Sequence, residues 1–84
     1  MNYEQVMSFT DREIKQMVFE DWDVAFQWFR EVQEVAKSYL YEANRRGVGI
    51  SNAPDLNAYY LPLKNKLAKF DIYVKEARRL GILT

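Results

Sequence analysis

The chain contains no cysteine and no histidine. Without cysteine there is no disulfide, no thiolate nucleophile, and no cysteine-ligated zinc or iron–sulfur site. Without histidine the chain lacks the residue that most often serves as a general base or a metal ligand. The sequence therefore predicts a protein that is not an enzyme, with no catalytic residue, no cofactor-binding residue and no metal ligand.

An excess of charge of one sign is also missing. The 84 residues carry twelve basic and twelve acidic side chains, so the formal net charge is zero. This balance argues against a general binder of polyanions, because nucleic-acid-binding domains are usually clearly basic. Hydrophobic residues make up 49% of the chain, which is enough for one packed domain over residues 1–84, and the length leaves no room for a second.

Long hydrophobic runs are absent as well. No apolar stretch approaches the roughly 18–20 residues that a membrane span needs. The first nine residues contain Glu4, have no basic start and are not followed by an apolar stretch, so we expect no signal peptide. Together with the lack of cysteine, these features favour a cytoplasmic location.

Glycine and proline are scarce, with three and two copies, and they fall mainly where helices are expected to begin or end. Thr10 followed by Glu13 matches the capping-box pattern at the start of a helix. Gly47 directly follows two arginines, a combination typical of a helix end. Asn52 as a capping residue and Pro54 in the first turn then indicate the next helix start.

Two features interrupt the expected helices. Asp21 and Asp23 are poor residues for a helix interior, which favours a break there, although one helix continuing into the next is an alternative. Pro62 removes one hydrogen bond inside the last helix and is expected to kink or break it. We expect helices over about 11–20, 22–46 and 55–80, with a loop over 47–54.

Hydrophobic residues recur along both long helices in alternating steps of three and four, the period of a packed helical seam. They are Trp22, Ala25, Phe29, Val32, Ala36, Tyr39 and Ala43 in the first helix, and Leu56, Tyr60, Leu63, Leu67, Phe70, Val74 and Ala77 in the second. Two such helices joined by a short loop predict an all-α fold, an antiparallel helical hairpin with a short N-terminal helix packed across it.

Charge is divided unevenly along the chain. Residues 11–34 hold seven acidic and three basic side chains, whereas residues 64–79 hold six basic and two acidic ones. In an antiparallel hairpin, the acidic beginning of the first arm would lie opposite the basic end of the second. We therefore expect these charges to pair within the chain, although exposed pairs contribute only about 0–1 kcal/mol each.

The chain has more apolar residues than one contact line between two helices can bury. The surplus residues are Phe26, Trp28, Val35, Leu40 and Tyr41 in the first long helix, and Tyr59, Ile72, Tyr73 and Leu80 in the second. The N-terminal segment can cover one side of the hairpin. The remainder predicts a second subunit or another protein, because monomers rarely expose large apolar patches. The alternative is a compact three-helix monomer in which the N-terminal segment covers everything.

Residues at the loop end and on one flank are the expected partner-binding residues. They are Trp28, Tyr41, Arg45, Arg46 and Tyr59. Tryptophan, tyrosine and arginine are the side chains that most often anchor a protein interface.

These observations predict a small, non-catalytic protein–protein interaction module. It would dock on another protein as an inhibitor, adaptor or regulator, and would associate as a homo-oligomer into a helical bundle. By analogy with other compact chains of this kind, we expect a phage or bacterial accessory protein. The alternative is a nucleic-acid-binding accessory protein, in which the Lys/Arg-rich last helix grips a strand on which its tyrosines stack.

Overall fold

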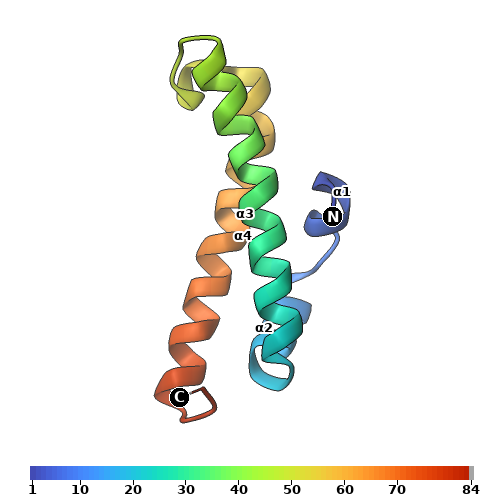
Figure 1. The fold of residues 1–84 in the computed structure, drawn as a ribbon. Coiled ribbons are helices and arrows are strands. Elements are labelled where there is room, and N and C mark those ends of the chain that lie inside the picture. Colours follow the sequence, from blue (N-terminus) through green and yellow to red (C-terminus); the bar gives the residue numbers. More distant parts are fainter. Residues whose placement is uncertain (84) are drawn as a thin grey trace.

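Residues 1–83, the part of the chain that the structure describes, are all-helical in this computed structural model (Figure 1). The elements are α1 (Tyr3–Met7), α2 (Asp11–Glu20), α3 (Trp22–Arg45), the short 3₁₀-helix η1 (Ile50–Asn52) and α4 (Pro54–Arg79). The predicted all-α fold class is confirmed. None of the helices within residues 1–83 is both long enough and apolar enough to cross a membrane.

The two long helices, α3 and α4, lie side by side with opposite chain directions, and η1 is part of the connection at one end (Figure 1). Their facing sides bury most of the residues of the two predicted stripes. Buried stripe residues are Ala25, Val32, Ala36 and Ala43 on α3, and Leu56, Leu63, Phe70, Val74 and Ala77 on α4. The alternating steps identified them because such spacing keeps one side of a helix turned toward its neighbour.

The break between α2 and α3 lies at Asp21, one of the residues that indicated it. Asp21 has a non-helical backbone, and its carboxylate accepts a hydrogen bond of 3.4 Å from the backbone N–H of Val24. At the start of α2, Thr10 and Glu13 exchange the two capping-box hydrogen bonds, each 3.1 Å long. α2 and α3 are therefore separate helices.

Several predicted helix boundaries need small corrections. The expectation that Asn52 caps the last helix is wrong, since Asn52 belongs to η1 and α4 begins at Pro54 without a side-chain cap. The second long helix begins and ends one residue earlier than predicted. Pro62 lies inside α4 without breaking it, because the loss of one hydrogen bond is tolerated when the rest of a long helix is packed.

The first helix, α1, was not predicted from the sequence. Asn2 and Gln5 form a second capping box at its start, with hydrogen bonds of 2.9 and 2.8 Å. Val6 anchors it, with a fully buried side chain. α1 and α2 both lie on the same side of the α3–α4 pair, as Figure 1 shows. The N-terminal segment therefore covers one side of the two long helices, as expected, but not the other.

Candidate functional site

Trp28 belongs to the core and not to an open flank. Its side chain is fully buried, and its indole Nε1 donates a 3.1 Å hydrogen bond to the backbone carbonyl of Val6. The Phe9 ring packs edge-on against the indole, with 6.1 Å between the ring centroids. The expectation that Trp28 forms a partner surface is wrong, because α1 and the segment that follows it cover this flank. The capping box at Asn2 was the sequence signal that could have predicted α1, the helix that covers Trp28.

Arg45 and Arg46 are held in an ion-pair cluster at the loop end, which we call the tip clamp. Nη1 of Arg46 lies 2.9 Å from Oδ2 of Asp55 and so connects the end of α3 to the start of α4. Nε of Arg45 donates a 2.9 Å hydrogen bond to Glu42, which also accepts one from Arg46. The arginines that the sequence proposed as anchors for a partner are thus already engaged by carboxylates of the chain.

The tip clamp lowers the pKa values of its two acids. The hydrogen bond from Arg45 is the main cause for Glu42, and the hydrogen bond from Arg46 is the main cause for Asp55. A carboxyl group whose pKa is lower in the folded state stabilises the fold above its unfolded pKa, and this stabilisation is lost as the pH falls through its folded pKa.

We therefore expect acid to remove the stabilising effect of the clamp. Wild-type protein and the Arg46→Met variant should differ in melting temperature at neutral pH, and this difference should shrink as the pH falls below about 4. Thermal unfolding followed by circular dichroism between neutral and acidic pH measures it. A difference that is the same at every pH would contradict a contribution from these ion pairs.

Tyr59 lies in a three-tyrosine stack, one helical turn beyond the clamp. Its ring is parallel to that of Tyr39, with 5.6 Å between the ring centroids. The ring of Tyr3 packs edge-on against both, with its centroid 6.2 Å from that of Tyr39 and 5.1 Å from that of Tyr59. Burial raises the pKa of Tyr39, with smaller contributions from Tyr3 and Tyr59. Tyr59 therefore helps to attach α1 to α3 and α4. Of the tyrosines and arginines predicted at the tip, Tyr41 is the most open, with 79% of its surface exposed.

The side of the α3–α4 pair that faces away from α1 and α2 carries a row of aromatic and aliphatic side chains on α3. We call this row the open aromatic face; it consists of Trp22, Phe26, Phe29 and Leu40. Phe26 is 46% exposed and Leu40 is 40% exposed, while Phe29 is half-buried. Trp22 stacks on Phe70 of α4 at 6.1 Å, and Phe26 lies between Trp22 and Phe29. Phe26 and Leu40 belong to the apolar surplus predicted from the sequence, whereas Trp22 and Phe29 are residues of the predicted stripe that stay partly exposed beside them. The N-terminal segment leaves this face uncovered.

The basic side chains of α4 are mostly not neutralised by the first half of the chain. Lys66 lies 3.6 Å from Asp11 and donates a 2.7 Å hydrogen bond to the carbonyl of Phe9. Lys75 instead pairs with Asp71 of its own helix, at 2.9 Å. Within residues 1–83, no carboxylate lies within 4.0 Å of four further bases, namely Lys64, Lys69, Arg78 and Arg79. The predicted pairing along the two arms is therefore wrong for most of these charges, because the facing sides of α3 and α4 are apolar.

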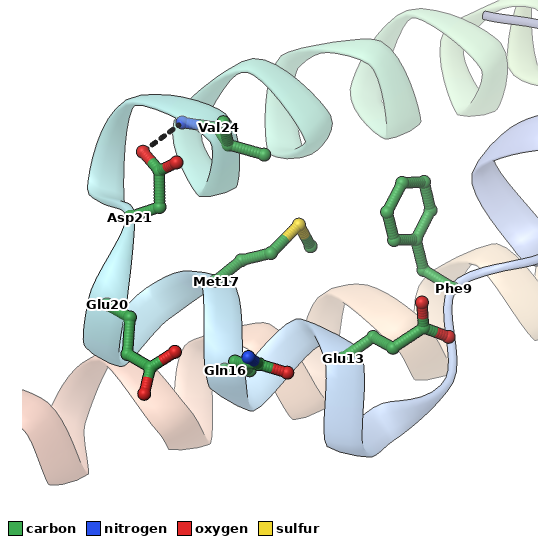
Figure 2. Close-up of a pocket in the computed structure, with 7 residues that line it drawn as sticks. All are labelled: Phe9, Glu13, Gln16, Met17, Glu20, Asp21 and Val24. Atoms are coloured by element: carbon green, nitrogen blue, oxygen red, sulfur yellow. Dashed lines mark hydrogen bonds between the residues drawn. The ribbon is translucent and has the colours of Figure 1, made fainter.

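An open groove of about 400 Å³ lies between α2 and the beginning of α3 (Figure 2). Its lining residues are Phe9, Glu13, Gln16, Met17, Glu20, Asp21 and Val24. Glu13 and Asp21 already cap helices, and the hydrogen bond from the backbone of Thr10 lowers the pKa of Glu13. Within residues 1–83 no group of three or more acidic side chains is arranged to hold a metal ion.

Comparisons with protein families, with curated proteins and with solved structures found no match to this chain.

Proposed function

We propose that this protein is a small interaction module that acts in the cytoplasm by docking on another protein as an inhibitor, adaptor or regulator. One observation carries the proposal. Large apolar side chains remain exposed on the outer sides of α3 and α4, although the chain already has a core that includes a fully buried tryptophan. Such surface is costly in water and is typical of a docking site.

We further propose that α3 and α4 act as an antiparallel hairpin that presents these side chains, and that the protein is a homo-oligomer. The core supports a rigid hairpin, because ring pairs such as Phe29–Phe70 and Tyr39–Tyr59 link the two helices at separate levels. Side chains on such helices are displayed in fixed positions, which lowers the entropic cost of docking.

Tyr41 is the residue at the tip that we expect to contact the partner. Its side chain lies on the outward side of α3 and makes no ring contact with another aromatic residue within residues 1–83. Tyr41→Ala should weaken partner binding by about 2 kcal/mol, the range of an interface anchor. The melting temperature should barely change, because substitutions of exposed residues usually alter stability by no more than about 0.5 kcal/mol.

The test is affinity capture from the source cell with wild-type, Tyr41→Ala and Ser38→Ala proteins as baits, followed by titration of the purified partner. Ser38 is the matched control, since it is exposed one helical turn earlier on the same helix. The proposal expects a partner that wild type and Ser38→Ala retain and Tyr41→Ala releases. A protein captured equally by all three baits would exclude Tyr41 as an anchor.

The alternative function, binding of a nucleic acid by α4, is favoured by one specific observation. The bases Lys64, Lys69, Arg78 and Arg79 have no carboxylate within 4.0 Å in the described part of the chain, so they are free to contact phosphates. Binding through phosphates weakens steeply as salt rises, because counterions are released from the strand. Titration of single- and double-stranded DNA and RNA at two salt concentrations tests this, and no binding at low salt excludes it.

A further inference from the structure

We propose that the open aromatic face binds a second copy of this chain, with a two-fold axis parallel to the long helices, so that two α3–α4 pairs form a four-helix bundle. The inference rests on the proposed function in one respect, the use of an exposed apolar face for association. It adds that a second copy of the chain occupies this face, how the two copies are oriented, and which charged residues pair between them.

The apolar part of the interface is a second stripe on α3. Phe26, Gln33 and Leu40 follow one another seven residues apart, beside the stripe that faces α4. Gln33 is the polar member, and Trp22 and Phe29 of the facing stripe are partly exposed next to Phe26 and extend the apolar surface. A helix that is apolar along two neighbouring stripes packs against two helices. α4 fills the first position, and within residues 1–83 no helix lies over the second (Figure 1).

α4 contributes half-buried side chains to the same face. Tyr59 contacts Tyr3 and Lys66 contacts Phe9, so these two residues mark the side of α4 that is turned toward the N-terminal segment. Tyr60 and Leu67 each follow one of them by a single residue, about 100° around the helix. They therefore lie on the opposite side of the buried stripe, next to the open aromatic face.

The contacts within one chain define which residues of α3 and α4 lie at the same level. Phe29 stacks on Phe70, Tyr39 on Tyr59, and Arg46 reaches Asp55. Each step forward along α3 is thus matched by a step backward along α4. The same register places Asp23 level with Lys75, Arg30 level with Asp71, and Glu34 level with Lys64.

A two-fold axis parallel to the helices keeps these levels and places α3 of one copy beside α4 of the other. All three level pairs then join opposite charges at the edge of the interface: Asp23 with Lys75, Arg30 with Asp71, and Glu34 with Lys64. Symmetry makes each pair occur twice. In one chain, Lys75 pairs with Asp71 at 2.9 Å and Glu34 with Lys37 at 3.6 Å, in exposed pairs that rearrange at little cost.

This complementarity favours a second copy over an unrelated partner. The interface is isologous, so both halves must be encoded in one chain, and here three pairs of opposite charges lie level in the register that the fold itself imposes. Edge charges of this kind set partner choice and orientation in helical bundles more than they add affinity.

The first experiment measures assembly and its dependence on the face. Sedimentation equilibrium of the full chain up to about 100 µM should give twice the 10.0 kDa mass of one chain. Phe26→Glu should raise the dissociation constant at least about tenfold, since it places a charge in the apolar centre. Ile72→Glu is the matched control, because Ile72 is 54% exposed on the outer side of α4 and its replacement should leave the dimer intact.

The second experiment tests the orientation. Arg30→Glu and Asp71→Arg should each weaken the dimer about three- to tenfold, and the double variant should restore it. Within residues 1–83 of one chain Arg30 and Asp71 do not pair with each other, and Asp71 pairs with Lys75 instead, so rescue would report a contact between copies. Circular dichroism of each variant separates loss of assembly from loss of fold.

The third experiment uses the absence of native cysteine. A mixture of Arg30→Cys and Asp71→Cys chains should form a mixed disulfide on oxidation, faster than either variant alone, because the bond requires Cβ atoms about 3.5–4.5 Å apart. Preferential self-linking of Gln33→Cys chains would place two α3 helices together and overturn the proposed orientation.

A monomer at all concentrations, or a dimer that Phe26→Glu does not affect, would overturn the inference itself. A monomer would also contradict the homo-oligomer proposed above. Docking on another protein is tested separately, and it fails if no partner is captured through Tyr41 or through the open aromatic face. A monomer that captures a partner through the open aromatic face would assign this face to another protein.

Discussion

Trp28→Ala is expected to lower the free energy of unfolding by about 3–5 kcal/mol, the range for removing a large buried aromatic side chain. The Trp28 side chain is fully buried where α1, the α1–α2 segment and α4 meet, and it contacts Phe9 and Phe70 by ring packing. Its loss leaves a cavity, and the Val6 carbonyl loses its hydrogen-bond donor. Since small domains are stable by only about 5–15 kcal/mol, the variant should unfold at a much lower denaturant midpoint.

Trp28→Phe separates the two contributions. It keeps most of the ring volume but removes the indole N–H, so it should cost less than Trp28→Ala while still leaving the Val6 carbonyl unsatisfied, at about 1–3 kcal/mol. Urea unfolding of both variants, followed by circular dichroism, measures the difference. A Trp28→Ala protein as stable as the wild type would show that α1 does not cover this flank in solution.

Phe70→Ala is the second substitution with a large expected effect, also about 3–5 kcal/mol. The Phe70 ring is stacked on Phe29 at 4.8 Å and lies 6.1 Å from Trp22 and 5.9 Å from Trp28. It is the ring that joins the buried core to the open aromatic face. Removing it therefore leaves three other rings without their common contact, beyond the area that Phe70 itself buries.

Tyr41→Ala is the control for Phe70→Ala, because it also removes an aromatic ring, but one that is 79% exposed. It should change the free energy of unfolding by no more than about 0.5 kcal/mol. Urea titrations of the two variants under the same conditions provide the comparison. A loss below about 1 kcal/mol for Phe70→Ala would mean that the stripe assigned to α4 is not the one that packs on α3.

Trp28→Ala and Phe70→Ala also bear on function, because each affects a different side of the α3–α4 pair. Trp28 lies under the N-terminal segment, whereas Phe70 supports Trp22 and Phe29 of the open aromatic face. A Phe70 variant that remained folded would therefore lose interactions at this face as well as stability. Because the Phe70 side chain belongs to the core and also supports the open aromatic face, the geometry of this face depends on how the core is packed.

Local patterns in the sequence determined the helices. The steps of three and four follow from the 3.6-residue turn, and caps such as Thr10 with Glu13 satisfy hydrogen bonds within four residues of the chain. The break at Asp21 was visible for the same reason. The second capping box, at Asn2 and Gln5, was equally local and predicts α1 when its spacing is considered.

The tertiary structure alone decided which apolar flank stays open. Trp28 and Phe26 both lie beside the α3 stripe, and their residue types do not say which of them α1 will cover. The same holds at the tip, where Arg46 meets Asp55 and Tyr59 meets Tyr3 only after distant segments pack together. Hydrophobic burial is not directional, so periodicity identifies an apolar side chain but not its neighbour. That choice depends on the side from which the N-terminal segment returns to the long helices.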